Sequence, residues 1–281
     1  MRTRPMLTFI CLMTLVILLL GIEPGGAAPE RNLSQYTARQ WAATFARAHA
    51  LPFAQRVAFW ADLAAVKSVY VLDPLGEGSG ALPDPGPLCD FAHVDCVTYL
   101  EQVYALTLSA TYTEFPAILR HIRYRESQVA YRWRNHYTVS DWLPANTWFL
   151  RDVTEDVGSG TTLRMTKTIS RAKFFAEKGL PQYHDIPDEV AVTTYIPRER
   201  AVEILGKLHT GDLLIFVIDT PGIIAGHVGL ARTDHGVVMV QHASMTQKAV
   251  VTVPLQTYLD HLPARFVGIK VARVYLERAT Q

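Results

Sequence analysis

Residues 95–109 have the sequence DCVTYLEQVYALTLS, in which only Glu101 and Gln102 are strongly polar after the opening aspartate. Apolar side chains on most sides of a helix indicate that the helix is buried. Asp95 is a favoured N-cap residue, so Cys96 falls in the first turn, where free N–H groups and the helix dipole stabilise an anion. We therefore expect a lowered thiol pKa and a nucleophilic thiolate at Cys96, with backbone N–H groups that can stabilise an oxyanion.

Short strands dominate the C-terminal third of the chain. Segments rich in valine and isoleucine alternate with turns there, at residues 212–219, 227–232, 237–244, 249–255 and 266–274. This pattern predicts an antiparallel sheet. Helices that precede a run of strands indicate an α+β fold, in which the buried helix packs on one face of the sheet.

The region before residue 95 is predicted to be helical and then irregular. Thr37 and Gln40 have the spacing of a capping box, and a second helix is expected to begin at Pro52. Residues 72–87 are rich in glycine, proline and aspartate, which is typical of a loop. Because no long linker interrupts the chain, we expect residues 29–281 to form a single domain, and we expect the protein to be a monomer.

The first 28 residues have the pattern of a secretory signal peptide. Arg2 and Arg4 precede an apolar run over residues 6–22, and small residues follow at 25–28. An uncleaved membrane anchor is the alternative, since the run approaches the length of a membrane span. Either way the chain is expected to be exported, to the periplasm or the medium, without stable membrane insertion once the signal is removed.

The charge balance gives no reason to expect a polyanionic partner. The chain has 27 basic and 26 acidic side chains, and 49% of its residues are hydrophobic. That composition is typical of a soluble globular protein, and a net charge near zero provides no general attraction to nucleic acid or to an anionic membrane. Nucleic-acid binding is therefore not expected, and the function has to be sought in a local site.

The cysteines outside the signal allow three interpretations. In an exported protein, Cys89 and Cys96 could form a disulfide, or Cys96 could be a catalytic thiol that stays reduced. A zinc site that includes His93 is a third possibility, because Cys89, His93 and Cys96 have the spacing C-x3-H-x2-C. No fourth ligand is evident nearby, so we expect neither a metal nor another cofactor.

A nucleophilic cysteine needs a base, and two of the ten histidines stand out by position. His227 begins the segment HVGLA after an expected loop at 220–226, and His242 lies in VMVQHAS on the next expected strand. A two-residue turn at 234 and 235 would place both imidazoles on one face, with Cβ atoms about 5 Å apart. A three-residue turn would shift the register by one and separate the faces unless a bulge compensates.

On the first of these registers the roles follow from acid–base chemistry. His227 would take the proton of Cys96 and later protonate the leaving amine, and His242 would accept a hydrogen bond from the other ring nitrogen of His227. The sequence thus predicts Cys96, His227 and His242 as catalytic residues.

Residues 131–146 alternate aromatic with charged and amide side chains. Such a mixture suits a sugar face together with a peptide carboxylate, although an ordinary surface segment explains any single residue equally well. The predicted substrate-binding residues are Asp95, Arg134, Asn135, Tyr137, Asp141 and Trp142.

Four ordered motifs, DCVTYLE from residue 95, TGDLLIF from 210, HVGLA from 227 and HAS from 242, resemble those of the NlpC-type papain-like peptidoglycan hydrolases. The segments IRYR from 122 and RNHYTVSDWLPAN from 134 are similar to a branch described as N-acetylmuramoyl-L-alanine amidase-like. The resemblance spans about residues 69–270. It implies a papain-like α+β fold in which Cys96, His227 and His242 are the nucleophile, the base and the orienting residue.

The same resemblance implies a substrate. It indicates cleavage of the amide between N-acetylmuramic acid and L-alanine in muropeptides, with a preference for 1,6-anhydro forms as one option. Two alternatives stay open: an endopeptidase of the same fold that cuts between D-glutamate and the diamino acid, and a non-catalytic wall-binding domain with a disulfide between Cys89 and Cys96. Cys89 departs from the family pattern and could allow inactivation by oxidation.

Overall fold

The N-terminal part of the chain is helical. The structure, a computed structural model, describes residues 31–74 and 76–275, so the predicted signal peptide lies outside the described residues. The first elements are η1 (Leu33–Gln35), α1 (Ala38–His49) and α2 (Phe53–Ala65). As predicted, Thr37 and Gln40 form a capping box at the start of α1, and α2 begins directly after Pro52. Within the described ranges no helix is long and apolar enough to cross a membrane.

The predicted buried helix is α3 (Cys96–Leu108), and every residue from Tyr99 to Thr107 is buried. Even the acidic Glu101 is enclosed, because its carboxylate has two partners. It accepts a hydrogen bond from Arg123 Nε at 2.6 Å and another from Trp142 Nε1 at 3.0 Å. Arg123 ends α4 (Phe115–Arg123), so this buried ion pair fastens α4 to α3.

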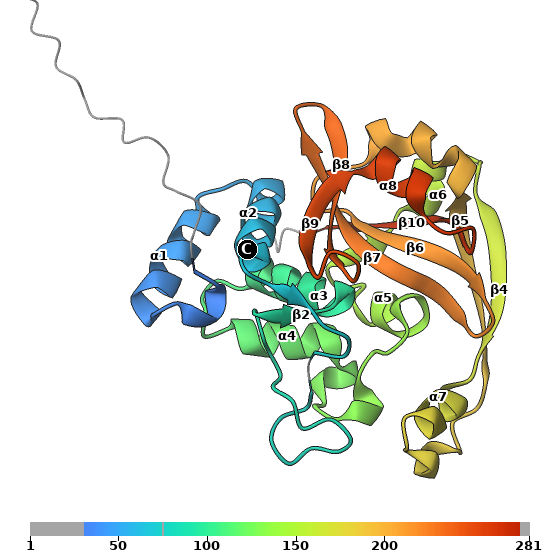
Figure 1. The fold of residues 1–281 in the computed structure, drawn as a ribbon, viewed down its shortest axis with the longest axis horizontal. Helices are drawn as coiled ribbons and strands as arrows, with labels where there is room; N and C mark the ends of the chain where they lie inside the picture. The colour runs from blue at the N-terminus through green and yellow to red at the C-terminus, as the bar shows by residue number, and fades with distance from the viewer. Residues whose placement is uncertain (1–30, 75, 276–281) are drawn as a thin grey trace, which may run out of the picture. The chain divides into compact units, whose positions relative to one another are not determined.

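The predicted sheet is present and larger than expected. Within the described residues ten strands form one sheet in the order β2-β1-β9-β8-β7-β6-β10-β5-β4, with β3 paired to β10 (Figure 1). The five expected segments correspond to β6 (Leu213–Thr220), β7 (Ile223–Asp234), β8 (Val237–Ser244), β9 (Ala249–Pro254) and β10 (Phe266–Val274). The strands that the pattern missed are β1 (Val69–Tyr70), β2 (His93–Val94), β3 (Leu150–Asp152), β4 (Leu163–Ile169) and β5 (Glu189–Pro197).

Both faces of the sheet are covered, as the side-chain alternation along β6 shows. Leu213 and Ile215 join the core formed with α1 to α4, whereas Leu214 and Phe216 join the core on the opposite face. That second core is closed by α6 (Thr154–Gly158), η6 (Arg198–Lys207) and α8 (Leu255–His261), which lie across the sheet from α3 (Figure 1). The prediction of an α+β fold with N-terminal helices and a C-terminal sheet is confirmed.

Short helical turns fill the segment between α4 and the main strands. They are η2 (Arg125–Ser127), η3 (Tyr131–Trp133), η4 (Thr138–Trp142), α5 (Leu143–Ala145), α7 (Arg171–Glu177) and η5 (Pro181–Tyr183). The last two lie between β4 and β5, and β4 pairs along its full length with residues 189–195 of β5. This segment has few long regular elements, so side-chain contacts define its shape.

The β7–β8 hairpin has a register that differs from both predicted ones. Its turn is His235–Gly236, with φ angles of 45° and 82°, and Leu230 lies opposite Gln241. The predicted turn at 234 and 235 is therefore wrong by one residue at each end. The observed strand register is therefore shifted by two residues from the predicted one. An even shift keeps side chains on the same face, so His227 and His242 still share a face, as diagonal neighbours.

The loop expected before His227 is absent. β6 and β7 continue to a tight turn at Pro221–Gly222, where Thr220 lies opposite Ile223. The regular pairing is interrupted just before His227, because Phe216 pairs with His227 and Val217 pairs with Ala225. The unpaired residue between them forms a β-bulge, a feature that locally redirects side chains.

Candidate active site

Cys96 lies at the N-terminus of α3, as predicted. The carboxylate of Asp95 accepts hydrogen bonds from the N–H groups of Val97 at 3.0 Å and Thr98 at 2.7 Å, and the Thr98 hydroxyl bonds to the N–H of Asp95 at 2.9 Å. This reciprocal cap fixes the first turn of the helix. The thiol of Cys96 is therefore held in a defined position on a rigid element.

The two predicted histidines form a hydrogen-bonded pair. Nε2 of His227 lies 2.9 Å from Nδ1 of His242, and the ring planes are nearly perpendicular, at 88°. His242 is buried, with 5% of its surface exposed, whereas His227 is half-buried. The contact leaves Nδ1 of His227 available for another partner.

Cys96 lies near the backbone of β7, at the point where β7 and β8 separate. The last paired residues of the two strands are Leu230 and Gln241, and beyond them lies Val228, whose backbone N–H is close enough to the sulfur of Cys96 to lower the thiol pKa. Val228 directly follows His227, so the structure brings the thiol to the residue next to the proposed base. His227 and His242 thus contact each other directly, and Cys96 lies near the backbone of the residue that follows His227.

Burial governs the protonation of the site. It raises the pKa of Cys96 to about 12, with a further rise from the charge of Asp95, and nearby backbone N–H groups offset only part of this. Burial also lowers the pKa of His227 to about 3 and that of His242 to about 4. The expected depression of the thiol pKa by the helix N-terminus is therefore wrong: the cost of desolvating the thiolate exceeds the stabilisation by the N–H groups. The structure holds a neutral thiol beside neutral imidazoles.

Two tyrosines that the sequence did not indicate border the site. Tyr258, on α8, packs its ring 4.7 Å from that of His242 and 6.2 Å from that of His227. Burial raises the pKa of both Tyr258 and Tyr70, and a thiolate at Cys96 would add to each shift. Neither residue belongs to a recognisable local pattern, since Tyr70 ends a two-residue strand and Tyr258 lies on a short helix.

The partners of Cys89 differ from those of Cys96. Both thiols are free, and the sulfur of Cys89 donates to Oε1 of Gln102 at 3.2 Å. His93 is exposed and bonds to Asp90 at 2.8 Å. The side chains considered for a zinc site thus have separate partners, and no group of three or more metal-ligating side chains occurs among the described residues.

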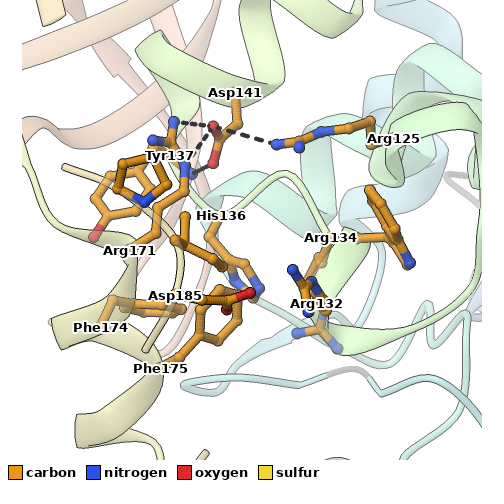
Figure 2. Close-up of a pocket in the computed structure, with 13 residues that line it drawn as sticks. Arg125, Arg132, Arg134, His136, Tyr137, Asp141, Arg171, Phe174, Phe175 and Asp185 are labelled. Carbon is orange, nitrogen blue, oxygen red and sulfur yellow. Dashed lines mark hydrogen bonds and ion pairs between the residues drawn. The ribbon is translucent and has the colours of Figure 1, made fainter. Parts of the chain in front are cut away.

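Three of the predicted substrate-binding residues, Arg134, Tyr137 and Asp141, line one cavity of about 250 Å³ (Figure 2). Asp141 is buried and forms an ion pair with Arg171, which also bonds to Glu189 at 2.7 Å. Sequence reasoning missed Arg171, because it lies 30 residues from Asp141 and no local pattern marks it. The cavity is assembled by contacts between distant segments.

The other predicted substrate-binding residues have structural roles. Trp142 is 2% exposed and donates its indole N–H to Glu101, so its side chain is not accessible to a substrate and that prediction needs correction. Asn135 is largely buried and bonds through its backbone N–H to the carbonyl of Arg123 at 2.9 Å, and it also lines a further cavity, of about 660 Å³, together with Asp141. Asp95 uses its carboxylate as the helix cap. An aromatic and polar sequence pattern did not distinguish the inward-facing side chains from those that line a cavity.

Comparison with known proteins connects this arrangement to a family. The family model described as AmiA-like, N-acetylmuramoyl-L-alanine amidase-like, matches residues 66–269. The chain belongs to this family. The matched region contains Cys96, His227 and His242, and membership indicates an amidase-like hydrolase that acts on the cell wall. No curated protein matches the chain.

Solved structures share the fold of this family member. A Legionella pneumophila protein aligns with a TM-score of 0.73 and 22% identity, over 84% of this chain and 94% of that chain. An N-acetylmuramoyl-L-alanine amidase from Bacteroides uniformis aligns with a TM-score of 0.65 and 25% identity, over 79% of this chain and 98% of that chain. The α+β architecture described above is therefore an arrangement that both proteins also have.

Proposed function

We propose that this family member is an exported cysteine amidase that hydrolyses the amide between N-acetylmuramic acid and L-alanine in muropeptides. The observation that carries the proposal is the hydrogen-bonded pair of His227 and His242, with Cys96 at the capped N-terminus of α3 near the backbone of Val228, the residue after His227. The family and the name of the Bacteroides uniformis amidase supply the bond that is cut. The four sequence motifs that resemble those of NlpC-type papain-like hydrolases agree with this chemistry.

The neutral protonation states favour attack with simultaneous proton transfer. His227 accepts the proton of Cys96 at Nδ1 as the sulfur attacks the carbonyl carbon of the amide, and the carbonyl oxygen becomes an oxyanion. The backbone N–H of Cys96 lies at the helix N-terminus, where it can stabilise that charge. The tetrahedral intermediate collapses to a thioester when the C–N bond breaks and the His227 imidazolium gives its proton to the amine of L-alanine.

Hydrolysis of the thioester completes the reaction. Water attacks the carbonyl carbon while His227 again serves as the base, and the C–S bond breaks to release the muramyl carboxylic acid and restore the thiol. In the tautomer that this sequence needs, Nε2–H of His227 donates to Nδ1 of His242 across the 2.9 Å contact. His242 then orients the base and stabilises its cationic form.

Product analysis of defined muropeptides tests the proposal. The mature protein is incubated with a disaccharide that carries a stem peptide, and the products are identified by mass spectrometry. An amidase releases an intact peptide that begins with L-alanine, whereas an endopeptidase leaves L-alanyl-D-glutamate on the sugar. A wall-binding domain gives no product.

Cys89→Ala and Cys96→Ala form a matched pair for this experiment. Both remove one thiol, but that of Cys96 lies near the backbone of Val228, next to His227, whereas that of Cys89 bonds to Gln102. We expect Cys96→Ala to abolish product formation and Cys89→Ala to retain it. Product formation by Cys96→Ala at the wild-type rate would refute the assignment of the nucleophile.

Export is part of the proposal and rests on residues 1–28 alone. The protein is expected in the periplasm or the medium, with the signal removed after the small residues at 25–28. N-terminal sequencing of protein recovered from these fractions checks this, and a chain that keeps residue 1 in a membrane fraction would instead indicate an anchor.

A further inference from the structure

A small cavity beside α4 lies apart from the arginine cavity, which is our name for the one that Arg134, Tyr137, Asp141 and Arg171 line. The small cavity has a volume of about 120 Å³, and the two cavities share no lining residue. Its wall is mostly aromatic and aliphatic, and comes from the loop before β2, the turn before α4 and α4 itself. The apolar lining residues are Leu88, Tyr112, Phe115, Pro116 and Leu119.

Arg123 contributes a buried hydrogen-bond donor to this apolar wall. Its side chain lines the cavity and is 2% exposed, and two of its three nitrogens are engaged. Nε donates to the carboxylate of Glu101 at 2.6 Å, and Nη1 donates to the carbonyl of Leu88 at 2.5 Å. Nη2 has no hydrogen-bond partner among the described residues, although the hydroxyl of Tyr124 lies near the guanidinium. A buried N–H without an acceptor is costly, so a ligand oxygen would be stabilised there.

The charges around the cavity favour a ligand without a charge. Glu101 already neutralises Arg123 in a buried ion pair, so the carboxylate of an acidic ligand would be repelled by that of Glu101. Arg120 also lines the cavity, but this residue is exposed and water screens its charge. The remaining polar group is the thiol of Cys89, which donates to Oε1 of Gln102 at 3.2 Å and stays neutral because burial raises its pKa to about 12.

The size of the cavity limits the ligand to about one ring or a short alkyl chain. Apolar protein cavities of about 150 Å³ bind a single benzene ring, and this cavity is slightly smaller. Its walls are rigid, because Phe115 and Leu119 are buried and the ion pair of Arg123 with Glu101 joins α4 to α3. The ring of Tyr112 stacks on that of Phe115, with centroids 5.8 Å apart. A preformed apolar wall with one polar group is typical of a small-molecule site.

We propose that this cavity binds a small uncharged molecule that has an apolar body and one carbonyl or hydroxyl oxygen. The oxygen accepts a hydrogen bond from Nη2 of Arg123, and the apolar body packs against Phe115 and Leu119. The site goes beyond the proposed function, because none of Cys96, His227 and His242 lines it. A muropeptide is charged and too large for a cavity of about 120 Å³, so the ligand belongs to a different chemical class.

Two probes of nearly equal shape test the inference. Acetophenone has one carbonyl oxygen, and ethylbenzene has a methylene group at the same position. Each is titrated into the mature protein, and its binding is measured by ligand-observed NMR. We expect acetophenone to bind with a Kd of about 1 mM or tighter. Benzoate has the same ring and a carboxylate, and we expect it to bind more weakly than acetophenone.

A double variant shows whether Arg123 supplies the hydrogen bond. Glu101→Gln combined with Arg123→Met removes the donor without leaving a buried charge unpaired, and the amide oxygen introduced at 101 can still accept from Trp142. We expect it to weaken acetophenone about tenfold and to change ethylbenzene by less than about twofold. The matched control is Glu177→Gln combined with Lys173→Met, an exposed ion pair that does not line this cavity.

A crystal of the wild-type protein soaked in acetophenone locates the ligand, and it decides the matter if the double variant does not fold. We expect the ring in this cavity and the carbonyl oxygen within about 3.2 Å of Nη2 of Arg123. An empty cavity, or an oxygen directed away from Nη2, overturns the inference. Equal weakening of acetophenone and ethylbenzene in the folded double variant overturns it as well. Tighter binding of benzoate than of acetophenone would refute the assignment of an uncharged ligand.

Discussion

The thiol and histidine site and the arginine cavity are built in different ways. The first is held by a capped helix and two paired strands, and its side chains are fixed by the backbone around them. The second is held by short helical turns whose positions depend on ion pairs such as Arg171 with Asp141. Regular elements hold reacting groups more accurately than turns do, whereas turns vary without disturbing the core.

This contrast implies two kinds of mutational effect. In the thiol site a small substitution should remove turnover and leave the fold intact, because it changes one side chain on a helix or strand that the surrounding core already holds in place. In the arginine cavity, loss of an ion-paired residue should lower the stability of the fold, because Asp141 and Glu77 would be left buried and unpaired.

The largest expected effect is that of Cys96→Ser. The change replaces sulfur by oxygen at the same position, so we expect turnover to fall by roughly a thousandfold or more while the melting temperature stays within a few degrees. Rates on a defined muropeptide and a thermal scan of the same preparations check this. Near wild-type activity would show that another nucleophile acts and that the rigid site is not the reacting centre.

His242→Ala should produce the next largest effect. It removes the partner of His227 Nε2, so we expect kcat to fall roughly a hundredfold or more with little change in KM, since the contact matters mainly when His227 becomes charged. His242→Asn and His242→Gln retain an acceptor and should restore part of the rate.

A core histidine that merely fills space would behave differently. In that case His242→Ala would lower the melting temperature, and the folded protein would keep its kcat. Such a purely thermal effect would remove His242 from the site and leave Cys96 with a single base.

The helix cap at Cys96 and the pairing of His227 with His242 were largely predictable from sequence because their determinants are local. Asp95 and Thr98 make the cap three residues apart, and the parity of a strand fixes which face His227 and His242 share. The turn position was not predictable, since Asp234, His235 and Gly236 are all residues that tolerate a turn. The pKa of Cys96 was mispredicted, because helix position is visible in a sequence and desolvation is not.

The arginine cavity was only partly predictable. Arg134, Tyr137 and Asp141 belong to one aromatic and polar segment, but Arg171 arrives from another part of the chain and pairs with Asp141 across 30 residues. Trp142 shows that residue type alone does not predict whether a side chain reaches a substrate. Its indole could stack on a sugar but instead donates a hydrogen bond to the buried Glu101. Strands β4 and β5 were also missed, although their pairing positions α7 and with it Arg171.

The pH dependence of the free energy of unfolding should distinguish the two regions, with a smaller effect than those of the substitutions above. Burial lowers the pKa of His136, in the arginine cavity, to about 4, as it lowers that of His242 to about 4. The unfolded chain binds these protons near pH 6.5, whereas the folded protein binds them only near pH 4. The free energy of unfolding should therefore fall as pH drops from about 6.5 to about 4, by about 3 kcal/mol per fully shifted histidine.

His136→Gln and His242→Gln assign this acid dependence. Each should remove up to one proton from the slope of unfolding free energy against pH, measured by denaturant titration at several pH values. Similar reductions in this slope for the two variants would mean that both regions exclude water to the same degree. An unchanged slope for His136→Gln would show that the arginine cavity opens to solvent more readily than the thiol site.

The smallest expected effect is that of Tyr258, whose ring covers the histidine pair from α8. Tyr258→Phe keeps the ring, and no hydrogen bond of the phenol occurs among the described residues, so we expect kcat to change by less than about threefold. Tyr258→Ala exposes the imidazoles, and because burial is what lowers the pKa of His227, that pKa should rise toward its ordinary value. The base would then be protonated at higher pH, and the acid limb of kcat/KM should move up by about one pH unit. A pH profile of the two variants checks this: an unshifted limb in Tyr258→Ala would mean that the sheet and α3, rather than α8, keep water from the site.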